Sequence, residues 1–240
     1  MVADKEGTHL HLIAESGVAE SITQRVYHTL RRDIVSGRLQ PGVKLKVEQL
    51  RKEYGVGTSP LREALSLLTS DYLVERIDQR GFRVSQISQR EYDDLLQTRC
   101  WLEERALRES IANGNNQWEE QLILANYRLS RIPRAATDKE PASNSDWEFA
   151  HKTFHETLIS LCGSSILLKY CAQLYEQNVR YRQLCVSAAY PDRDVTEEHN
   201  NICDAVLARD ADLAVHLLLS HYNNTSRFVR NELEFQNKPE

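Results

Sequence analysis

The chain has 240 residues, 27% of them charged, and a formal net charge of −5. This length is sufficient for one or two domains with a hydrophobic core. No apolar run approaches the roughly 20 residues of a membrane-spanning helix, and the five cysteines show no CxxC pair or disulfide-framework spacing. These features exclude a membrane protein and a small disulfide-stabilised secreted domain, and we expect a cytoplasmic protein with reduced thiols.

The charge is divided unequally along the chain. Residues 21–86 contain 12 Lys and Arg against 7 Asp and Glu, a net charge of +5, so the remainder carries −10. A basic segment joined to an acidic one indicates that only the first segment binds a polyanion such as DNA.

The first 55 residues predict an arm and two helices. Residues 1–19 show no hydrophobic period, and we expect them to form a flexible arm. A helix is predicted near 20–36, followed by a Pro-Gly turn with short extended flanks at 38–45. A second helix is predicted at 47–54 and ends at Gly55.

A third helix and a hairpin follow. We expect Ser59 to cap the helix and Pro60 to take its first position, because a hydroxyl accepts a free backbone N–H and proline has none to lose. Arg62 is left on the exposed face, since the apolar side chains share the other face: Leu61, Ala64, Leu65 and Leu68. Apolar residues at 73–74 and 82–84 around a polar turn at 78–81 predict a β-hairpin. Residues 20–86 therefore predict a winged helix-turn-helix DNA-binding domain.

The remainder of the chain lacks strand signals and shows helical periodicity. The predicted fold class is mainly α, with the winged helix-turn-helix followed by an all-helical bundle over residues 87–232. We expect a polar loop at 133–145 and a frayed tail at 233–240. The predicted helices span residues 88–112, 116–132, 144–162, 165–188, 193–208 and 210–230.

Four histidines of the bundle show a suggestive spacing. His151 and His155 are four residues apart and project from one helix face. His199 and His221 lie 10 and 12 residues on either side of a predicted turn near 209, so an antiparallel hairpin brings them to similar heights. Converging imidazoles suit zinc, nickel or another borderline divalent metal. The alternative is a set of core histidines that are hydrogen-bonded to one another or to water.

Two stretches of the sequence closely resemble the GntR family of bacterial transcription regulators: IVSGRLQPGVKL and YGVGTSPLREALSLLTSDYLVERIDQRGFRV. The helical part resembles the FadR-type (FCD) effector domain of that family. The matching motifs there are TRCWLEERA at 98–106, HKTFH at 151–155 and EHNNICDAVLARDADLAVHLLLSH at 198–221. The resemblance covers residues 20–230, with a weaker likeness to the branch that contains the carbon-starvation regulator CsiR.

This resemblance implies a homodimer on a short palindromic operator, with a metabolite in the helical domain that alters DNA affinity. It implies that Arg62 contacts base edges and that Gly81 lets the wing approach the minor groove. Many members carry arginine where this chain has Thr58, so base readout would depend on Arg62 and Ser59. The candidate DNA contacts are Arg32, Lys46, Thr58, Ser59, Arg62, Arg80 and Gly81. Taken individually, the basic residues could equally be solvated surface.

The resemblance also implies ligand sites in the bundle. Many FCD domains hold a divalent metal with one aspartate and three histidines. His155, His199 and His221 match the histidines, and His151 takes the place of the aspartate. By the same resemblance Arg99 faces the effector cavity and binds a carboxylate, although Arg99 and Glu103 could simply form an intrahelical salt bridge. Arg180 is a second candidate effector contact.

Three functions remain open at this point. The first is a regulator, acting as a repressor, whose operator affinity responds to a small carboxylate bound near the metal. The second is a metal sensor in which the ion is the signal. The third is a helical metallohydrolase, which the sequence argues against, because HKTFH has lysine where the zinc-protease motif HExxH has its general-base glutamate. We therefore predict that the protein is not an enzyme.

Overall fold

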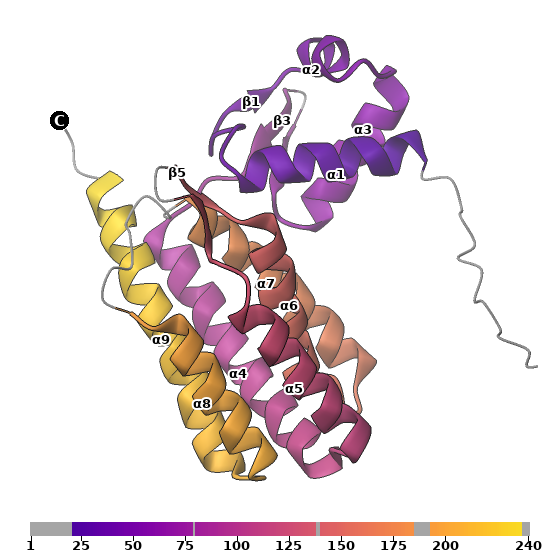
Figure 1. The fold of residues 1–240 in the computed structure, drawn as a ribbon. Helices are drawn as coiled ribbons and strands as arrows, with labels where there is room; N and C mark the ends of the chain where they lie inside the picture. Colours follow the sequence, from indigo (N-terminus) through magenta and orange to yellow (C-terminus); the bar gives the residue numbers. More distant parts are fainter. Residues whose placement is uncertain (1–20, 79, 138–139, 185–192, 237–240) are drawn as a thin grey trace, which may run out of the picture.

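The computed structural model describes residues 21–78, 80–137, 140–184 and 193–236. A small domain of helices and strands sits at one end of an elongated helical bundle (Figure 1). The predicted arm at 1–19 and the end of the predicted tail, from 237, lie outside the described residues. The elements of the small domain are α1 (Ile22–Val35), β1 (Lys44–Leu45), α2 (Val47–Tyr54), α3 (Thr58–Ser70), β2 (Val74–Ile77) and β3 (Gly81–Val84).

The first two helices begin and end at local signals. Ser21 forms a capping box with Gln24, in which each side chain bonds to the backbone N–H of the other residue. Helix α2 ends at Gly55, whose φ of +64° places it in the left-handed region that glycine adopts without steric cost. Both helices match the predicted positions.

Helix α3 begins at Thr58, two residues earlier than expected. Gly57 is the N-cap, and no side chain caps the helix, so Ser59 lies inside the first turn. Pro60 is tolerated there because the first backbone N–H groups of a helix have no intrahelical acceptor to lose. The expected capping role of Ser59 is therefore wrong. The predicted apolar face is confirmed, with Leu61, Ala64, Leu65 and Leu68 all buried.

The predicted hairpin is confirmed and gains a third strand. The antiparallel sheet has the order β1-β3-β2, with Leu45 opposite Phe82 and Val74 opposite Val84. The buried side chains of the sheet pack with α1 and α3 into one hydrophobic core. This core fixes the orientation of α3 and of the wing, and so positions the surface that the sequence assigns to DNA.

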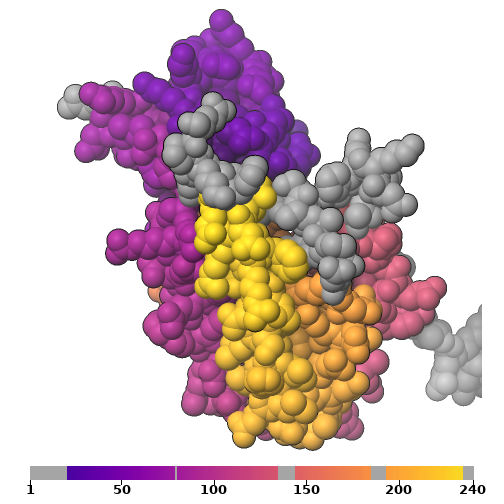
Figure 2. All heavy atoms as spheres, turned by 90° about the vertical axis from the view of Figure 1, so that its left-hand side faces the viewer, coloured from indigo at the N-terminus to yellow at the C-terminus, as the bar shows by residue number. Residues whose placement is uncertain are grey.

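Within the described residues six helices form the bundle, as expected. Ser88 caps α4 by accepting the backbone N–H of Glu91. Helix α9 runs along the length of the bundle, visible as the yellow surface in Figure 2. None of the helices in the described ranges is long and apolar enough to cross a membrane. The helices are α4 (Gln89–Asn113), α5 (Asn116–Ser130), α6 (Ser145–Ile159), α7 (Ser165–Leu184), α8 (Val195–Leu207) and α9 (Ala211–Gln236).

Two expectations about the bundle need correction. The segment predicted as a polar loop contains a two-stranded hairpin of β4 (Ala135–Thr137) and β5 (Glu140–Ser143). Its residues lack the alternating apolar pattern of a buried strand, which is why periodicity did not reveal it. Helix α9 continues to Gln236, past residue 233 where we expected fraying, because Val229 and Leu233 pack against Tyr92 and Leu95 of α4. The predicted end of α7 at 188 lies outside the described residues.

Candidate DNA interface and metal centre

All seven candidate DNA contacts are exposed, on α1, at the start of α2, on the first turn of α3 and on the wing. Thr58, Ser59 and Arg62 lie together on the first turn of α3, beside backbone N–H groups that no side chain caps. Such a helix end attracts phosphate, and the N-terminal residues of a recognition helix reach base edges in the major groove. The exposed start of α3 therefore has the geometry of a DNA-reading helix.

The cations of this domain divide into two groups. Arg38, for example, bonds Asp33, Glu53 and Tyr54 and holds α1 against α2, and Arg31 pairs with Glu176 of the bundle. Within the described residues, seven of the 12 form no ion pair and stay available to phosphates: Arg25, Lys44, Lys46, Lys52, Arg62, Arg76 and Arg80. Arg32 makes only a long 3.9 Å contact with Asp33.

Gly81 begins β3 with a φ of +94°, and a Cβ placed on it would meet nothing within 4 Å. The position therefore requires glycine for its backbone conformation rather than for space. Its exposure on the wing leaves the backbone open to close approach by a ligand.

The four histidines converge inside the bundle. His151 and His155 come from α6, His199 from α8 and His221 from α9, and all are buried. One ring nitrogen of each lies within 4.8 Å of the corresponding nitrogens of the other three. The Nε2 atoms of His151 and His155 are 3.1 Å apart. The predicted convergence is confirmed, and the four buried histidines form a possible metal site.

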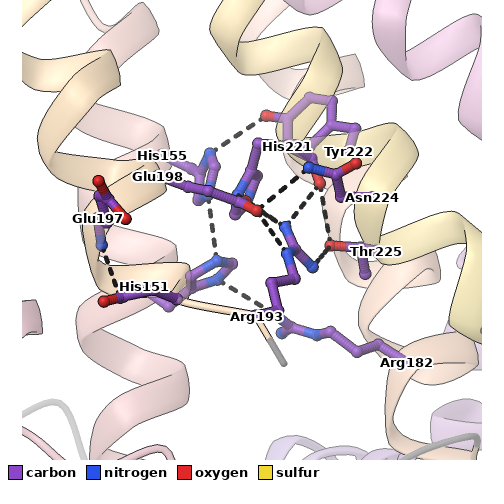
Figure 3. A network of polar contacts seen from close by, with 11 residues as sticks. His151, His155, Arg182, Arg193, Glu197, Glu198, His221, Tyr222, Asn224 and Thr225 are labelled. Carbon is purple, nitrogen blue, oxygen red and sulfur yellow. Dashed lines mark hydrogen bonds and ion pairs between the residues drawn. The ribbon is translucent and has the colours of Figure 1, made fainter. Parts of the chain in front are cut away.

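Outer partners fix three of the rings, and Figure 3 shows those of His155 and His221. The Nδ1 of His151 is 2.8 Å from the Tyr175 hydroxyl, and the Nδ1 of His155 is 3.1 Å from the Tyr222 hydroxyl. The Nδ1 of His221 lies 2.7 Å from a carboxylate oxygen of Glu198 and donates to it. Hydrogen bonds at Nδ1 orient the rings and would leave Nε2 to coordinate a metal, which is the usual arrangement around histidine-bound metals.

Comparison with known proteins decides the family. The family model described as bacterial regulatory proteins, gntR family, matches residues 22–84. The FCD domain model matches residues 94–224, more than half of the chain. The chain belongs to the GntR family and carries an FCD domain.

Individual relatives agree with this assignment. The HTH-type transcriptional regulator BphR of Paraburkholderia xenovorans (strain LB400) is 39% identical over 88% of this chain and 86% of its own length. The HTH-type transcriptional repressor GlaR of Escherichia coli (strain K12) is 33% identical over 81% of this chain and 90% of its own length. The solved structure of E. coli McbR/YncC, 21% identical, matches 88% of this chain and 98% of its own with a TM-score of 0.71, which shows a shared fold. These relatives are regulators, so this GntR-family protein is a transcription regulator and not an enzyme.

Burial keeps the four histidines of this GntR-family regulator neutral. Desolvation, together with repulsion among the rings and from nearby arginines, lowers the pKa of His151, His155 and His199 well below 6.5. Burial also lowers the pKa of His221 to about 4, although the hydrogen bond to Glu198 opposes this shift. Neutral imidazole is the form that binds metal, so the cluster is ready to coordinate a cation at neutral pH.

The donor set fits a divalent metal. Zinc–nitrogen bonds of about 2.0–2.1 Å place tetrahedral nitrogens about 3.3 Å apart, so only a modest contraction of the cluster is needed. The Nε2 of His199 is buried and has no hydrogen-bond partner among the described residues. A buried polar atom without a partner costs about 1–3 kcal/mol, and a bound cation would remove that cost.

A cavity adjoins the histidines and is lined by arginines. His151 and His221 form part of its wall, together with Arg99, Arg134, Arg182 and Arg193. The Nε of Arg99 donates to Glu103 at 2.7 Å, and its guanidinium lies 4.0 Å from the centroid of the Tyr222 ring. The Nη2 of Arg99 is buried without a partner among the described residues. The two interpretations of Arg99 are therefore compatible, since one edge forms the salt bridge and another stays available in the cavity.

Arg180 is not among the residues that line this cavity, so its role as an effector contact stays a prediction without support from the cavity. Its Nη2 instead donates to the backbone carbonyl of Ser85, where the two domains join. Residues 180 and 182 point in different directions from one helix, and only Arg182 lines the cavity. The two lie only two positions apart, so sequence alone could not decide which one faces inward.

Arg193 and Glu198 are functional candidates that the sequence did not reveal. Arg193 donates to both carboxylate oxygens of Glu198, to the backbone carbonyl of His221 and to the Thr225 hydroxyl. Arg193 lies near the start of a helix and Glu198 beside a histidine, and neither belongs to a periodic pattern. The only available signal was the position of Glu198 next to His199.

Proposed function

We propose that this regulator represses transcription as a cytoplasmic homodimer on a palindromic operator, and that a small organic acid bound beside a divalent metal in the FCD domain changes its operator affinity. His151, His155, His199 and His221 hold zinc or nickel, and Arg99 binds the carboxylate. The repressor role is supported by the similarity to the transcriptional repressor GlaR, which is 33% identical to this chain. The likeness to the CsiR branch remains an expectation.

The observation that carries the effector proposal is the buried Nη2 of Arg99, which has no partner among the described residues and belongs to a residue that lines the cavity next to two of the histidines. A carboxylate offers two acceptors for guanidinium donors and can also coordinate a cation. A small organic acid would therefore satisfy both the arginine and an open metal position.

The DNA half of the proposal rests on the exposed first turn of α3. Arg62 forms no ion pair among the described residues and can bind guanine O6 and N7 with two donors. Thr58 and Ser59 offer single hydroxyls beside it. Arg32, Lys46 and Arg80 supply phosphate contacts around this centre, and Gly81 brings the wing to the minor groove.

The test combines metal uptake, operator selection and a ligand screen on the full-length protein. Zinc and nickel contents are measured after loading, and an operator is selected from a random duplex pool. Small mono- and dicarboxylates are then screened for stabilisation of the metal-loaded protein, because a ligand that binds the folded state raises the melting temperature. Hits are tested in operator gel shifts. Absence of metal uptake, or specific operator binding that no carboxylate alters, would contradict the proposal.

An Arg99→Met variant gives the matched comparison. It keeps a long side chain over Tyr222 but removes the guanidinium, and we expect it to lose the carboxylate response while it still takes up metal. The exposed Arg227→Ala variant removes the same charge from the bundle surface and should respond as the wild type does.

The second candidate is a metal sensor, favoured by the same four-histidine cluster. In that case a chelator alone changes operator affinity, and no carboxylate adds to the effect. The screen above separates the two functions, because it measures operator binding with metal alone and with metal plus carboxylate.

A further inference from the structure

Helix α7 contacts both the histidine cluster and the DNA-binding domain. The hydroxyl of Tyr175 meets the Nδ1 of His151 at 2.8 Å. The next residue, Glu176, accepts from Arg31 of α1 and, at 2.6 Å, from Lys152 of α6. Two adjacent residues therefore connect this helix to the site and to the small domain.

Two turns further along α7, nearby residues again contact the histidine site on one side and the DNA-binding domain on the other. Arg182 lines the cavity, lies 3.3 Å from the Nδ1 of His151 and pairs with Glu148. Arg180 faces the DNA-binding domain and donates to the carbonyl of Ser85. Earlier on α7, the side chain of Gln173 donates to the backbone carbonyl of Ser70 at the end of α3. One face of the helix thus meets the site, and the other meets the domain that reads DNA.

Ser85 is held from both sides at the junction. Its backbone N–H donates to the carbonyl of Leu73 in the DNA-binding domain at 3.0 Å, and its carbonyl accepts from Arg180 of the bundle. Three residues later, Ser88 caps α4. A single residue therefore contacts both α7 and the DNA-binding domain, three positions before the cap of the first bundle helix.

Burying the Arg180 guanidinium against Ser85 costs free energy, which indicates that this contact does more than fill space between the domains. Arg180 is 4% exposed, and no carboxylate forms an ion pair with it in the described part of the chain. Its Nε is buried without a partner among the same residues. Burying a cation without an ion-pair partner costs free energy, and burial lowers the pKa of Arg180 although Tyr181, Glu91 and Glu75 oppose this shift. Simple packing would be satisfied by an apolar side chain.

We propose that Arg180 is a positioning residue that holds the DNA-binding domain on α7 through Ser85, so that occupancy of the histidine site shifts the domain. The coupling part rests on the metal site proposed above. Coupling requires that the bound and free sites favour different placements of α7. Tyr175 and Arg182 connect α7 to this difference, because both contact His151, whose ring would shift if a bound metal drew the four nitrogens together.

The experiment uses the full-length protein with Zn²⁺ as the probe and the selected operator duplex. Arg180→Met removes every side-chain donor while it keeps the length of the side chain, and Arg180→Lys keeps the charge and the donors of an ammonium group. Fluorophores on non-canonical residues at exposed positions 52 and 120 report the distribution of distances between the domains. Zinc affinity and operator affinity with and without zinc are measured for each variant.

We expect zinc to change the operator affinity of the wild type by about 5-fold or more, the usual lower range of allosteric coupling. Arg180→Met should broaden the interdomain distances and remove most of this change, with zinc affinity retained, whereas Arg180→Lys should restore part of it. Retained zinc affinity shows that the variant bundle is folded, so a lost response cannot come from misfolding.

Two results overturn the inference. One is an Arg180→Met variant with the distance distribution and the zinc response of the wild type. The other is a wild type that binds zinc with no change in operator affinity. A wild type that binds no zinc instead contradicts the proposed metal site, and the role of Arg180 is then judged by the distance distribution alone.

Discussion

The DNA-binding domain and the helical bundle use charged side chains in opposite ways. The candidate DNA contacts of the first domain are exposed, and seven of its cations form no ion pair among the described residues. In the bundle, by contrast, the side chains of Arg99, Arg182 and Arg193 are at most 9% exposed and each pairs with a glutamate. The cations of the candidate DNA surface are hydrated, whereas these three arginines of the bundle are buried together with their counter-charges.

This difference in exposure predicts that the two sets of cations respond differently to salt and to substitution. Exposed cations act at long range on phosphates and lose effect as salt rises. Enclosed cations interact through a low dielectric, so they discriminate strongly between ligands and tolerate few substitutions. Salt should therefore weaken operator binding much more than ligand binding in the bundle. The following predictions test this contrast, from the largest expected effect to the smallest.

The metal-free bundle should lose stability as pH falls below 6.5, before the DNA-binding domain does. Burial lowers the pKa of the four histidines, that of His221 to about 4, so the unfolded chain binds more protons in this interval. The free energy of unfolding then falls by up to about 1.4 kcal/mol per pH unit for each histidine. Tryptophan fluorescence reports the bundle, because all three tryptophans lie at positions 101, 118 and 147.

The DNA-binding domain supplies the control for this pH profile. Burial opposes ionisation of Asp33, but hydrogen bonds from Arg38 and Tyr54 outweigh it and lower its pKa below 3.8. The stability that Asp33 contributes is present above 3.8 and is lost only as pH falls further. Amide hydrogen exchange should show this domain folded while the bundle opens. Loss of both domains at one pH would contradict the contrast.

Glu103→Ala should lower the free energy of unfolding by about 3–5 kcal/mol, because it leaves the Arg99 guanidinium buried without its carboxylate. Glu109→Ala is the matched control. Glu109 pairs with Arg105 on the same helix at the same spacing, but the pair is exposed and should contribute only about 0–1 kcal/mol. Denaturant unfolding measures both. Equal losses would show that burial does not distinguish the two pairs.

Arg62→Ala should weaken specific operator binding by about 1–3 kcal/mol, since it removes a bidentate base contact. Its melting temperature should stay that of the wild type, because the side chain is exposed and unpaired among the described residues. The selected operator and a scrambled duplex are compared by fluorescence anisotropy. Equal weakening on both duplexes would assign Arg62 to phosphate rather than to bases.

Gly81→Ala should cost about 1 kcal/mol of stability, because an L side chain is strained at a φ of +94° even where space is free. Gly81→Asn should cost less, since asparagine tolerates the left-handed region better than alanine. Thermal unfolding measures both variants. An alanine variant as stable as the wild type would remove the conformational argument for this glycine.

Much of the DNA-binding domain follows from local sequence. The apolar face of α3, the end of α2 at Gly55 and the hairpin around Gly81 each depend on residues within a few positions of one another. Their exposed faces carry the candidate DNA contacts, so the site needs little tertiary information. The start of α3 shows the limit: Gly57 caps it instead of Ser59, because a capping hydroxyl is favourable but not obligatory.

The sequence by itself indicated the family through the resemblance of its motifs. Its periodicity and spacing predicted a winged domain followed by a helical bundle and grouped the four histidines, because they place side chains on helix faces. Only the tertiary structure decided that Arg182 rather than Arg180 lines the cavity, and that Arg193 and Glu198 complete the surroundings of His221. It also gave Arg180 its place against Ser85. These contacts join residues from different helices, and which faces meet depends on how the helices pack, which no single helix encodes.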